Sequence, residues 1–186
     1  MVYILLGKGF EEMEAIAPCD ILRRANIDVQ FVGLSGKLVS GGHGIQVSAD
    51  ITVDEMDLEN MDMIVLPGGV GGVNSIRGCE KALHAVKYAW ENDRFVAAIC
   101  AAPMILAQLG IANGRKATCY PGLEANMGSA VMQEGAATVT DGRLLTGAGP
   151  GTAVDFGLLL VSALKGEAKA KEVYDGLVYR LACPGK

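Results

Sequence analysis

The sequence predicts an α/β fold in which a doubly wound, mostly parallel sheet is sandwiched between helices. Short apolar segments that end in glycine or another small residue alternate with segments of helical periodicity, and such strand-loop-helix repeats form parallel sheets covered on both faces. The composition, with 51% hydrophobic, 20% charged and 5% aromatic residues, is typical of a compact α/β protein. At 186 residues the chain can bury a full core, so we expect a single domain over residues 1–186.

The first strand is expected at 2–6, an apolar run bounded by glycine and therefore buried on both faces. Residues 27–33 alternate apolar and polar side chains, which favours a second strand. The glycine-rich segment 35–53 is typical of a hairpin or flap, and buried strands are expected again at 62–66 and 95–99. Later in the chain the pattern predicts shorter strands separated by turns, at 116–120, 136–140 and 144–145.

The first helix is expected over residues 11–24. This segment has a partly apolar face, and Arg23 and Arg24 suit the negative end of the helix dipole. Pro18 lies inside the pattern and should kink the helix or mark a break. Further helices are expected at 79–92, from Cys100 to about Gly110, at 151–165 and at 167–180.

Several classes of protein are disfavoured by composition. The net charge of −5 and the lack of a Lys/Arg cluster argue against nucleic acid or an anionic membrane as partner. The amino-terminal apolar run is too short for a signal peptide, and no run reaches the roughly 18 residues of a membrane span. The five cysteines are odd in number and contain no C-x-x-C pair, which argues against a zinc or other metal site and against a disulfide framework. A reducing cytoplasm is therefore the expected location.

Cys100 is the candidate nucleophile, because it stands where the strand 95–99 runs directly into a helix. Ala98 and Ala102 flank it in a small-x-Cys-x-small pattern, which a sharp strand-to-helix turn requires. Pro103 fits the first turn of the helix, whose free amides and dipole would favour thiolate over thiol. The alternative is a buried cysteine that acts as a small apolar core residue.

Two more features follow strand ends and so belong at the same edge of the sheet, where open α/β folds bind ligands. Gly68 and Gly69 end the strand 62–66, and glycine allows close approach of backbone amides to an oxyanion. The amides of Gly69 and Ala101 are the candidate oxyanion donors, with Gly68 lining the pocket. Alternatively, residues 68–72 make only a tight turn. They do not form a P-loop, since no Lys-Ser/Thr follows.

Three glutamates open the first helix. Acidic side chains in a first turn complement the helix dipole, which accounts for Glu11 and Glu12. Glu14 faces nearly opposite Glu12 and can be partly buried; a carboxyl desolvated beside a thiolate would have a raised pKa and hold a proton for transfer. His84 is expected at the surface of a helix, and His43, in the flap, can reach the site without being evident as a partner of the cysteine.

Four motifs, in this order, carry a resemblance to a known family: Gly-Phe-Glu-Glu-Met-Glu at 9–14, Val-Leu-Pro-Gly-Gly at 65–69, Ala-Ala-Ile-Cys-Ala-Ala-Pro at 97–103 and Gly-Pro-Gly-Thr at 149–152. On these motifs the chain resembles the DJ-1/PfpI (ThiJ) family over nearly its whole length, and most closely the DJ-1 branch. The resemblance implies a flavodoxin-like sandwich, a homodimer, a Cys100 thiolate held by a protonated Glu14, and oxyanion donors at Gly69 and Ala101.

The chain departs from the family pattern at three places. Tyr120 stands where the branch often has a histidine, Ala148 replaces an arginine before Gly-Pro-Gly-Thr, and His43 stands where another arginine lies. These changes argue against a Cys-His mechanism and against an arginine-lined anion pocket. The peptidase branch has a histidine directly after its cysteine, and Ala101 in that position argues against a peptidase.

The resemblance implies an enzyme that needs no cofactor and acts on small aldehydes or dicarbonyls such as methylglyoxal, or on their adducts, as a glyoxalase or deglycase. Cys100 would attack the aldehyde, Glu14 would carry the proton and Tyr120 would donate a hydrogen bond. The alternative is a redox sensor or stress-protective chaperone in which Cys100 is oxidised to a sulfinate. An amidase or peptidase is a third hypothesis and would need a histidine partner.

Overall fold

The computed structural model describes residues 1–179, so the end of the helix expected at 167–180, and Cys183, lie outside the described residues. At its centre is a seven-stranded sheet with the order β10-β11-β7-β6-β1-β2-β5, in which only β10 runs antiparallel to its neighbour. The strands are β1 (Val2–Leu6), β2 (Val29–Gly33), β5 (Ile51–Thr52), β6 (Met63–Leu66), β7 (Phe95–Ile99), β10 (Thr138–Asp141) and β11 (Leu144–Gly147). The mostly parallel sheet confirms the predicted fold class.

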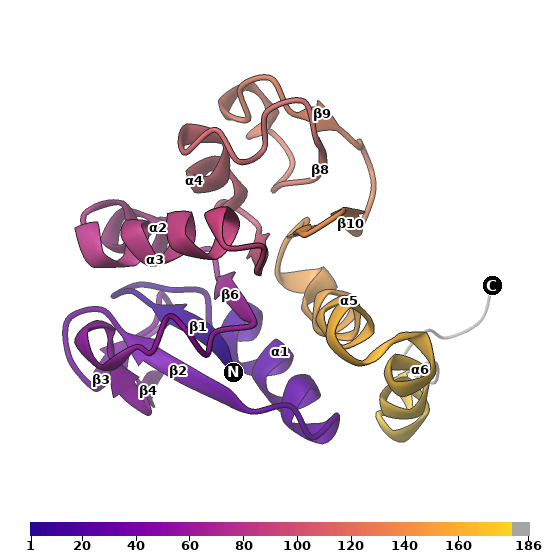
Figure 1. Cartoon of the computed structure of the whole chain (residues 1–186), viewed down its shortest axis with the longest axis horizontal. Coiled ribbons are helices and arrows are strands. Elements are labelled where there is room, and N and C mark those ends of the chain that lie inside the picture. The colour runs from indigo at the N-terminus through magenta and orange to yellow at the C-terminus, as the bar shows by residue number, and fades with distance from the viewer. Residues whose placement is uncertain (180–186) are drawn as a thin grey trace.

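Helices cover both faces of this sheet (Figure 1). One layer contains α1 (Glu12–Arg24), α5 (Ala153–Lys165) and α6 (Glu167–Gly176), and the other contains α2 (Val70–Arg77) and α3 (Glu80–Glu91). The short helix α4 (Pro103–Gln108) follows β7. Among residues 1–179, no helix combines the length and the apolar character that crossing a membrane requires.

Two small sheets lie apart from the main one. The antiparallel pair β3 (Leu38–Ser40) and β4 (Gln46–Ser48) confirms the hairpin expected within 35–53, and β5 adds an edge strand that the pattern did not predict. The strand expected at 116–120 is only β8 (Lys116–Ala117), which pairs with β9 (Val131–Met132). Beyond β8 the Thr118 amide bonds at 2.9 Å to the side-chain hydroxyl of Thr146 on β11 rather than to a backbone carbonyl, so the ladder does not continue.

The helix expected from Cys100 begins only at Pro103, because Cys100 has a φ of 65° and cannot be helical. The first helix runs from Glu12 to Arg24 without a break at Pro18. The turn expected at 68–72 is also wrong in part, since α2 begins at Val70 and includes the last two of these glycines.

Glycine in α2 is required by close packing rather than by a turn. A Cβ on Gly72 would lie 2.7 Å from the Phe10 Cα, and one on Gly71 would lie 2.9 Å from the Gly9 Cα. Any side chain at these two positions would push α2 away from the loop after β1. The glycines therefore bring α2, and Gly69 immediately before it, against the residues that open α1.

The order of strands creates a switch point beside β1. The chain goes from β1 to β2 on one side and then crosses to β6 and β7 on the other. Loops diverge at such a point and leave a crevice beyond the carboxyl ends of the strands. In this protein the segments after β1, β6 and β7 meet there, and they carry the first helix, the glycine pair and Cys100.

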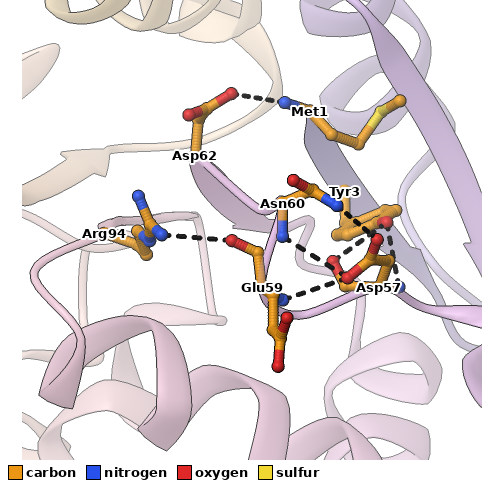
Figure 2. Close-up of polar contacts among 7 residues, drawn as sticks. All are labelled: Met1, Tyr3, Asp57, Glu59, Asn60, Asp62 and Arg94. Carbon is orange, nitrogen blue, oxygen red and sulfur yellow. Dashed lines mark hydrogen bonds and ion pairs between the residues drawn. The ribbon is translucent and has the colours of Figure 1, made fainter.

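The segment that leads into β6 is tied to β1 by a polar network (Figure 2). The buried Tyr3 hydroxyl donates to the Asp57 carbonyl at 3.3 Å and accepts from the Asp57 amide at 3.1 Å. The Asp57 carboxylate accepts from Asn60 Nδ2 at 2.6 Å, and Met1 pairs with Asp62. These contacts hold the start of β6 in register with β1.

Replacing Tyr3 with phenylalanine should lower the free energy of unfolding by about 1 kcal/mol, because the part-buried Asp57 amide loses its acceptor. Urea denaturation measures the change. Tyr88→Phe is the matched control, since the Tyr88 hydroxyl makes no side-chain hydrogen bond within residues 1–179 and its removal should change stability little. Equal effects of the two substitutions would contradict this role for the Tyr3 hydroxyl.

Candidate active site

Cys100 sits at a strained turn between β7 and α4. Its φ of 65° is unusual for a residue with a side chain, and it is 8% exposed. The backbone on both sides of the thiol is fixed: the Cys100 amide donates to the Gly147 carbonyl at 2.9 Å, and the Tyr120 amide donates to the Cys100 carbonyl at 2.8 Å. This strand-to-helix turn is the one that the small-x-Cys-x-small pattern predicts.

Glu14 is fully buried on the first turns of α1. Its Oε2 accepts a hydrogen bond from the Gly68 amide at 2.8 Å, whereas its buried Oε1 has no nitrogen or oxygen partner within residues 1–179. The Glu14 carboxyl lies close enough to the Cys100 thiol for each group to shift the pKa of the other. The structure therefore brings together the two residues that the sequence proposed as a pair.

Gly68 separates these two side chains and leaves room for no other group. A Cβ at this position would lie 2.7 Å from Glu14 Oε2, 2.8 Å from Cys100 Cβ and 3.1 Å from the Ala101 amide nitrogen. The amides of Gly69 and Ala101 both interact with the Cys100 sulfur. Both sequence-predicted donors thus face the thiol, and the absence of a side chain on Gly68 lets the thiol meet the carboxyl.

Burial dominates the protonation of the pair. It raises the pKa of Glu14 to about 7, although the Cys100 thiol and the Gly68 amide each lower it and the charge of Glu11 raises it further. The pKa of the Cys100 thiol is raised to about 12, by burial first and then by the charge of Glu14 and its hydrogen bond, while the amides of Gly69 and Ala101 lower it. The amides therefore act in the expected direction, toward the thiolate, but burial and the charge of Glu14 outweigh them.

After burial, the second cause of the raised thiol pKa is the charge of Glu14, because two acids so close together cannot both ionise easily. The high pKa of the thiol belongs to the state in which Glu14 already carries the negative charge. When the proton sits on Glu14 instead, the repulsion disappears and the carboxyl can donate to the sulfur. Above about pH 7 the pair holds one negative charge, and the surrounding groups decide whether that charge lies on the carboxylate or on the thiolate.

Tyr120 touches the site through its backbone rather than through its hydroxyl. Its amide bonds to the Cys100 carbonyl, and its side chain is 47% exposed. The ring lies beside Gly149, where a Cβ would come within 3.2 Å of Tyr120 Cδ2. The phenol hydroxyl makes no side-chain hydrogen bond within residues 1–179, so it is free to meet a ligand.

His43 bonds to Glu12 rather than to the Cys100–Glu14 pair. Glu12 accepts from the His43 amide at 2.7 Å and lies 2.8 Å from its Nδ1. Burial raises the pKa of Glu12, but hydrogen bonds, those to His43 foremost, outweigh burial and lower it; the same contact raises the pKa of His43. Glu12 is buried, whereas a role limited to the helix dipole would leave it at the surface. The hairpin is thereby held against the start of α1. His84 is exposed on α3, as expected.

One cluster within residues 1–179 has the residue types of a metal site. Glu11, Glu12 and His43 place one ligand atom each within 4.8 Å of one another. Both oxygens of Glu12 already engage His43, and Glu11 Oε2 accepts from the Glu14 amide at 2.9 Å. These hydrogen bonds account for the three side chains as structural contacts between α1 and the hairpin.

The raised pKa of Glu14 makes stability depend on pH. The folded protein holds this proton up to about pH 7, whereas the unfolded chain releases it near 4.5. The stabilising contribution is therefore full below pH 4.5 and is lost as the pH rises through about 7, by up to a few kcal/mol. Urea denaturation at pH 5 and pH 8 should show wild type losing stability relative to Glu14→Gln; a constant difference would contradict this.

Known proteins share both the sequence and the fold. The model of the DJ-1/PfpI family matches residues 1–163. Protein dj-1beta of Drosophila melanogaster is 36% identical over 177 residues, which cover 94% of this chain and 95% of that protein. A Pyrococcus horikoshii protein named Deglycase PH1704 is 34% identical over 126 residues, which cover 68% of this chain and 75% of that protein.

Solved structures agree with the sequence comparison. The crystal structure of Drosophila melanogaster DJ-1beta superimposes with a TM-score of 0.89 at 36% identity and covers 95% of this chain and 96% of its own. Toxoplasma gondii DJ-1, in a structure described as oxidized, gives a TM-score of 0.90 at 28% identity, with 95% and 97% coverage. Over nearly its whole described length, the chain therefore belongs to the DJ-1/PfpI family.

Proposed function

We propose that this protein is a cofactor-independent enzyme of the glyoxalase or deglycase type, acting on methylglyoxal-like dicarbonyls or their adducts. The observation that carries the proposal is the contact between the buried Glu14 carboxyl and the Cys100 thiol, with the amides of Gly69 and Ala101 on the same sulfur. A nucleophile, a proton carrier and two oxyanion donors are the groups that aldehyde addition needs. The relative named Deglycase PH1704 supports this choice of chemistry.

In the first step the Cys100 thiolate adds to the aldehyde carbon of methylglyoxal, and a carbon–sulfur bond forms. The π electrons of the carbonyl move to oxygen, where the amides of Gly69 and Ala101 stabilise the negative charge. Glu14 gives its proton to this oxygen, so the product is a neutral hemithioacetal and Glu14 becomes a carboxylate. A carboxyl with a pKa of about 7 can give and take this proton at neutral pH.

In the second step Glu14 removes the hydrogen from the former aldehyde carbon, and the electron pair left behind forms an enediol. The hydroxyl proton passes from the first oxygen to the second, with the Tyr120 hydroxyl as the hydrogen-bonding group. Glu14 then returns its proton to the second carbon, which gives a lactoyl thioester. The first carbon is oxidised as the second is reduced, so no external oxidant is needed. Water hydrolyses the thioester to lactate and frees the thiol.

The test is lactate formation by the purified protein incubated with methylglyoxal and no added cofactor. The proposal expects lactate in proportion to protein concentration. Cys119→Ala is a matched control, because Cys119 is also a buried thiol near Tyr120 but makes no contact with Glu14 in the structure. Lactate formation no faster than the rate without protein would overturn the proposal.

A redox sensor or stress-protective chaperone is the second candidate. The favouring observation is the unpartnered, buried Oε1 of Glu14 beside the thiol, since a protonated carboxyl there can donate to an oxygen of a Cys100 sulfinate. The oxidized structure of the Toxoplasma gondii relative supports the same idea. Mass measurement after mild peroxide distinguishes the candidates: selective gain of two oxygens on Cys100 with negligible dicarbonyl turnover favours the sensor.

An amidase or peptidase has less support. Such an enzyme needs a histidine on the thiol, and within residues 1–179 His43 pairs with Glu12 while His84 is exposed on α3. Hydrolysis of a peptide panel that depends on Cys100 would reverse this ranking.

We also propose that the protein is a homodimer. Large apolar side chains on α1, Met13 and Ile16, are 55% and 40% exposed, and Leu38 and Ile45 on the adjacent hairpin are 63% and 53% exposed. Hydrogen bonds between Glu12 and His43 join these two elements, and large exposed apolar side chains on joined elements are typical of a protein interface. Light scattering should give the mass of two chains, and the mass of one chain would contradict the proposal.

The free thiols within residues 1–179, at Cys19, Cys79, Cys100 and Cys119, suit a reducing compartment. We therefore place the protein in the cytoplasm, where dicarbonyls formed in metabolism would meet Cys100 as a thiol. Fractionation of cells that express the chain with a detection tag tests this placement.

A further inference from the structure

A closed set of hydrogen bonds links Glu11 to the active pair. The Glu11 carboxylate caps α1 by accepting from the Glu14 amide at 2.9 Å, and the Glu11 amide donates to the Gly68 carbonyl at 3.1 Å. The Gly68 amide in turn donates to Glu14 Oε2 at 2.8 Å. Glu11 therefore bonds through its side chain to the Glu14 amide and through its backbone to Gly68, the glycine that lies between Glu14 and Cys100.

The same segment supports the oxyanion donors. Gly69 has a φ of 82°, and a Cβ there would lie 2.7 Å from the Glu11 nitrogen. Glu11, the N-cap of α1, and Gly69, one of the two candidate oxyanion donors, are thus in direct backbone contact. A shift of Glu11 would therefore also displace the backbone of Gly69.

Glu11 also acts by charge. The ionisable groups that act on the Glu14 carboxyl are Glu11 from the cap of its own helix and Cys100 from the end of β7, and the remaining contact is the uncharged Gly68 amide from the end of β6. Glu11 does not act in the same way on Cys100, whose neighbours are Glu14 and the amides of Gly69 and Ala101. A second carboxylate near Glu14 opposes the loss of its proton.

We propose that Glu11 is a positioning residue, which holds Glu14 against Cys100 through the helix cap and biases the shared proton toward Glu14 through its charge. The inference rests on the proposed function, since it concerns the same pair. Because Glu11 repels a charge on Glu14 more than one on Cys100, it shifts the single negative charge of the pair onto the sulfur. Its effect is to raise the fraction of thiolate without touching the substrate.

Alkylation of Cys100 by iodoacetamide, followed by peptide mass analysis from pH 5 to pH 10, measures the thiolate directly. Glu11→Gln keeps an oxygen that can cap α1 but removes the charge. In this variant the inflection of the alkylation rate against pH should move to lower pH. The alkylation rate near pH 7.5 should fall roughly three- to tenfold, because a shift of one pKa unit changes the ratio of the two charge states tenfold. Glu11→Asp, which keeps the charge and the capping oxygen, should restore most of the rate.

Glu55→Gln is the control, because Glu55 also accepts a backbone N–H at the start of a helical turn, from Thr52 at 2.7 Å, but belongs to no site element. Its profile should match wild type. If Glu11→Gln lowers only the melting temperature and leaves the alkylation profile unchanged, Glu11 is merely a cap and the inference is overturned. If wild type and Glu14→Gln give the same alkylation profile, Glu14 and Cys100 do not ionise as a pair, and the inference about Glu11 is overturned together with the proposed function.

Discussion

Cys100→Ala should reduce lactate formation from methylglyoxal by about 10³-fold or more, to near the uncatalysed rate. Aldehyde addition needs a nucleophile, and removing a covalent nucleophile typically leaves only the small contribution of binding and oxyanion stabilisation. The substitution removes one sulfur atom from a residue that is 8% exposed, and alanine adopts the φ of 65° no less readily than cysteine. The fold should therefore be kept while the activity is lost.

The comparison that isolates the sulfur is Cys119→Ala, assayed beside Cys100→Ala at equal protein concentration. Cys119 is 4% exposed and directly precedes Tyr120, so it is a buried thiol close to the candidate site that does not contact Glu14. It should retain activity within about twofold, as substitutions outside a catalytic pair usually do. Wild-type turnover by Cys100→Ala would remove Cys100 from the mechanism.

Gly68→Ala should lower kcat by roughly 100-fold and the free energy of unfolding by about 1–3 kcal/mol, the usual range for overpacking. The added methyl group would lie 2.7 Å from Glu14 Oε2 and 2.8 Å from Cys100 Cβ, closer than atoms can pack. One of the two side chains must move, and the contact that joins them is then broken. The effect on kcat should exceed any effect on KM, because the change lies at the reacting groups.

Gly151→Ala is the matched control for this methyl group. Gly151 belongs to the Gly-Pro-Gly-Thr motif, yet a Cβ at this position meets nothing within 4 Å and its φ lies outside the left-handed region. Activity and urea midpoint should stay near those of wild type. If Gly68→Ala behaves like Gly151→Ala, then Glu14 and Cys100 do not depend on close contact.

Local patterns predicted the parts of the site that depend on adjacent residues. The small residues on both sides of Cys100 allow the turn between β7 and α4, and the strand ends place Gly68 and Glu14 at the same edge of the sheet. Parallel topology follows from alternating strands and helices, so the convergence of three loops could be expected before their contacts were known.

The parts that failed depend on residues far apart in the chain. Glu12 and His43 are 31 residues apart, and nothing local indicates that a glutamate in the first turn of a helix is buried by a hairpin. The pKa of the Cys100 thiol was expected to be lowered by helix amides, but burial and the charge of Glu14 outweigh them. Glu11 carried only the general signal of an acidic residue at a helix start, which complements the dipole, whereas its backbone contact with Gly68 arises only in the folded sheet.

The central claim is that Glu14 and Cys100 ionise as one pair. Its most direct test is the pH dependence of Cys100 alkylation in wild type and in Glu14→Gln. The account predicts an inflection near pH 7 in wild type, where the pair loses its first proton and part of the charge lies on sulfur. Glu14→Gln should lose this inflection and show a single thiol ionisation at higher pH. Identical profiles for the two proteins would contradict the account.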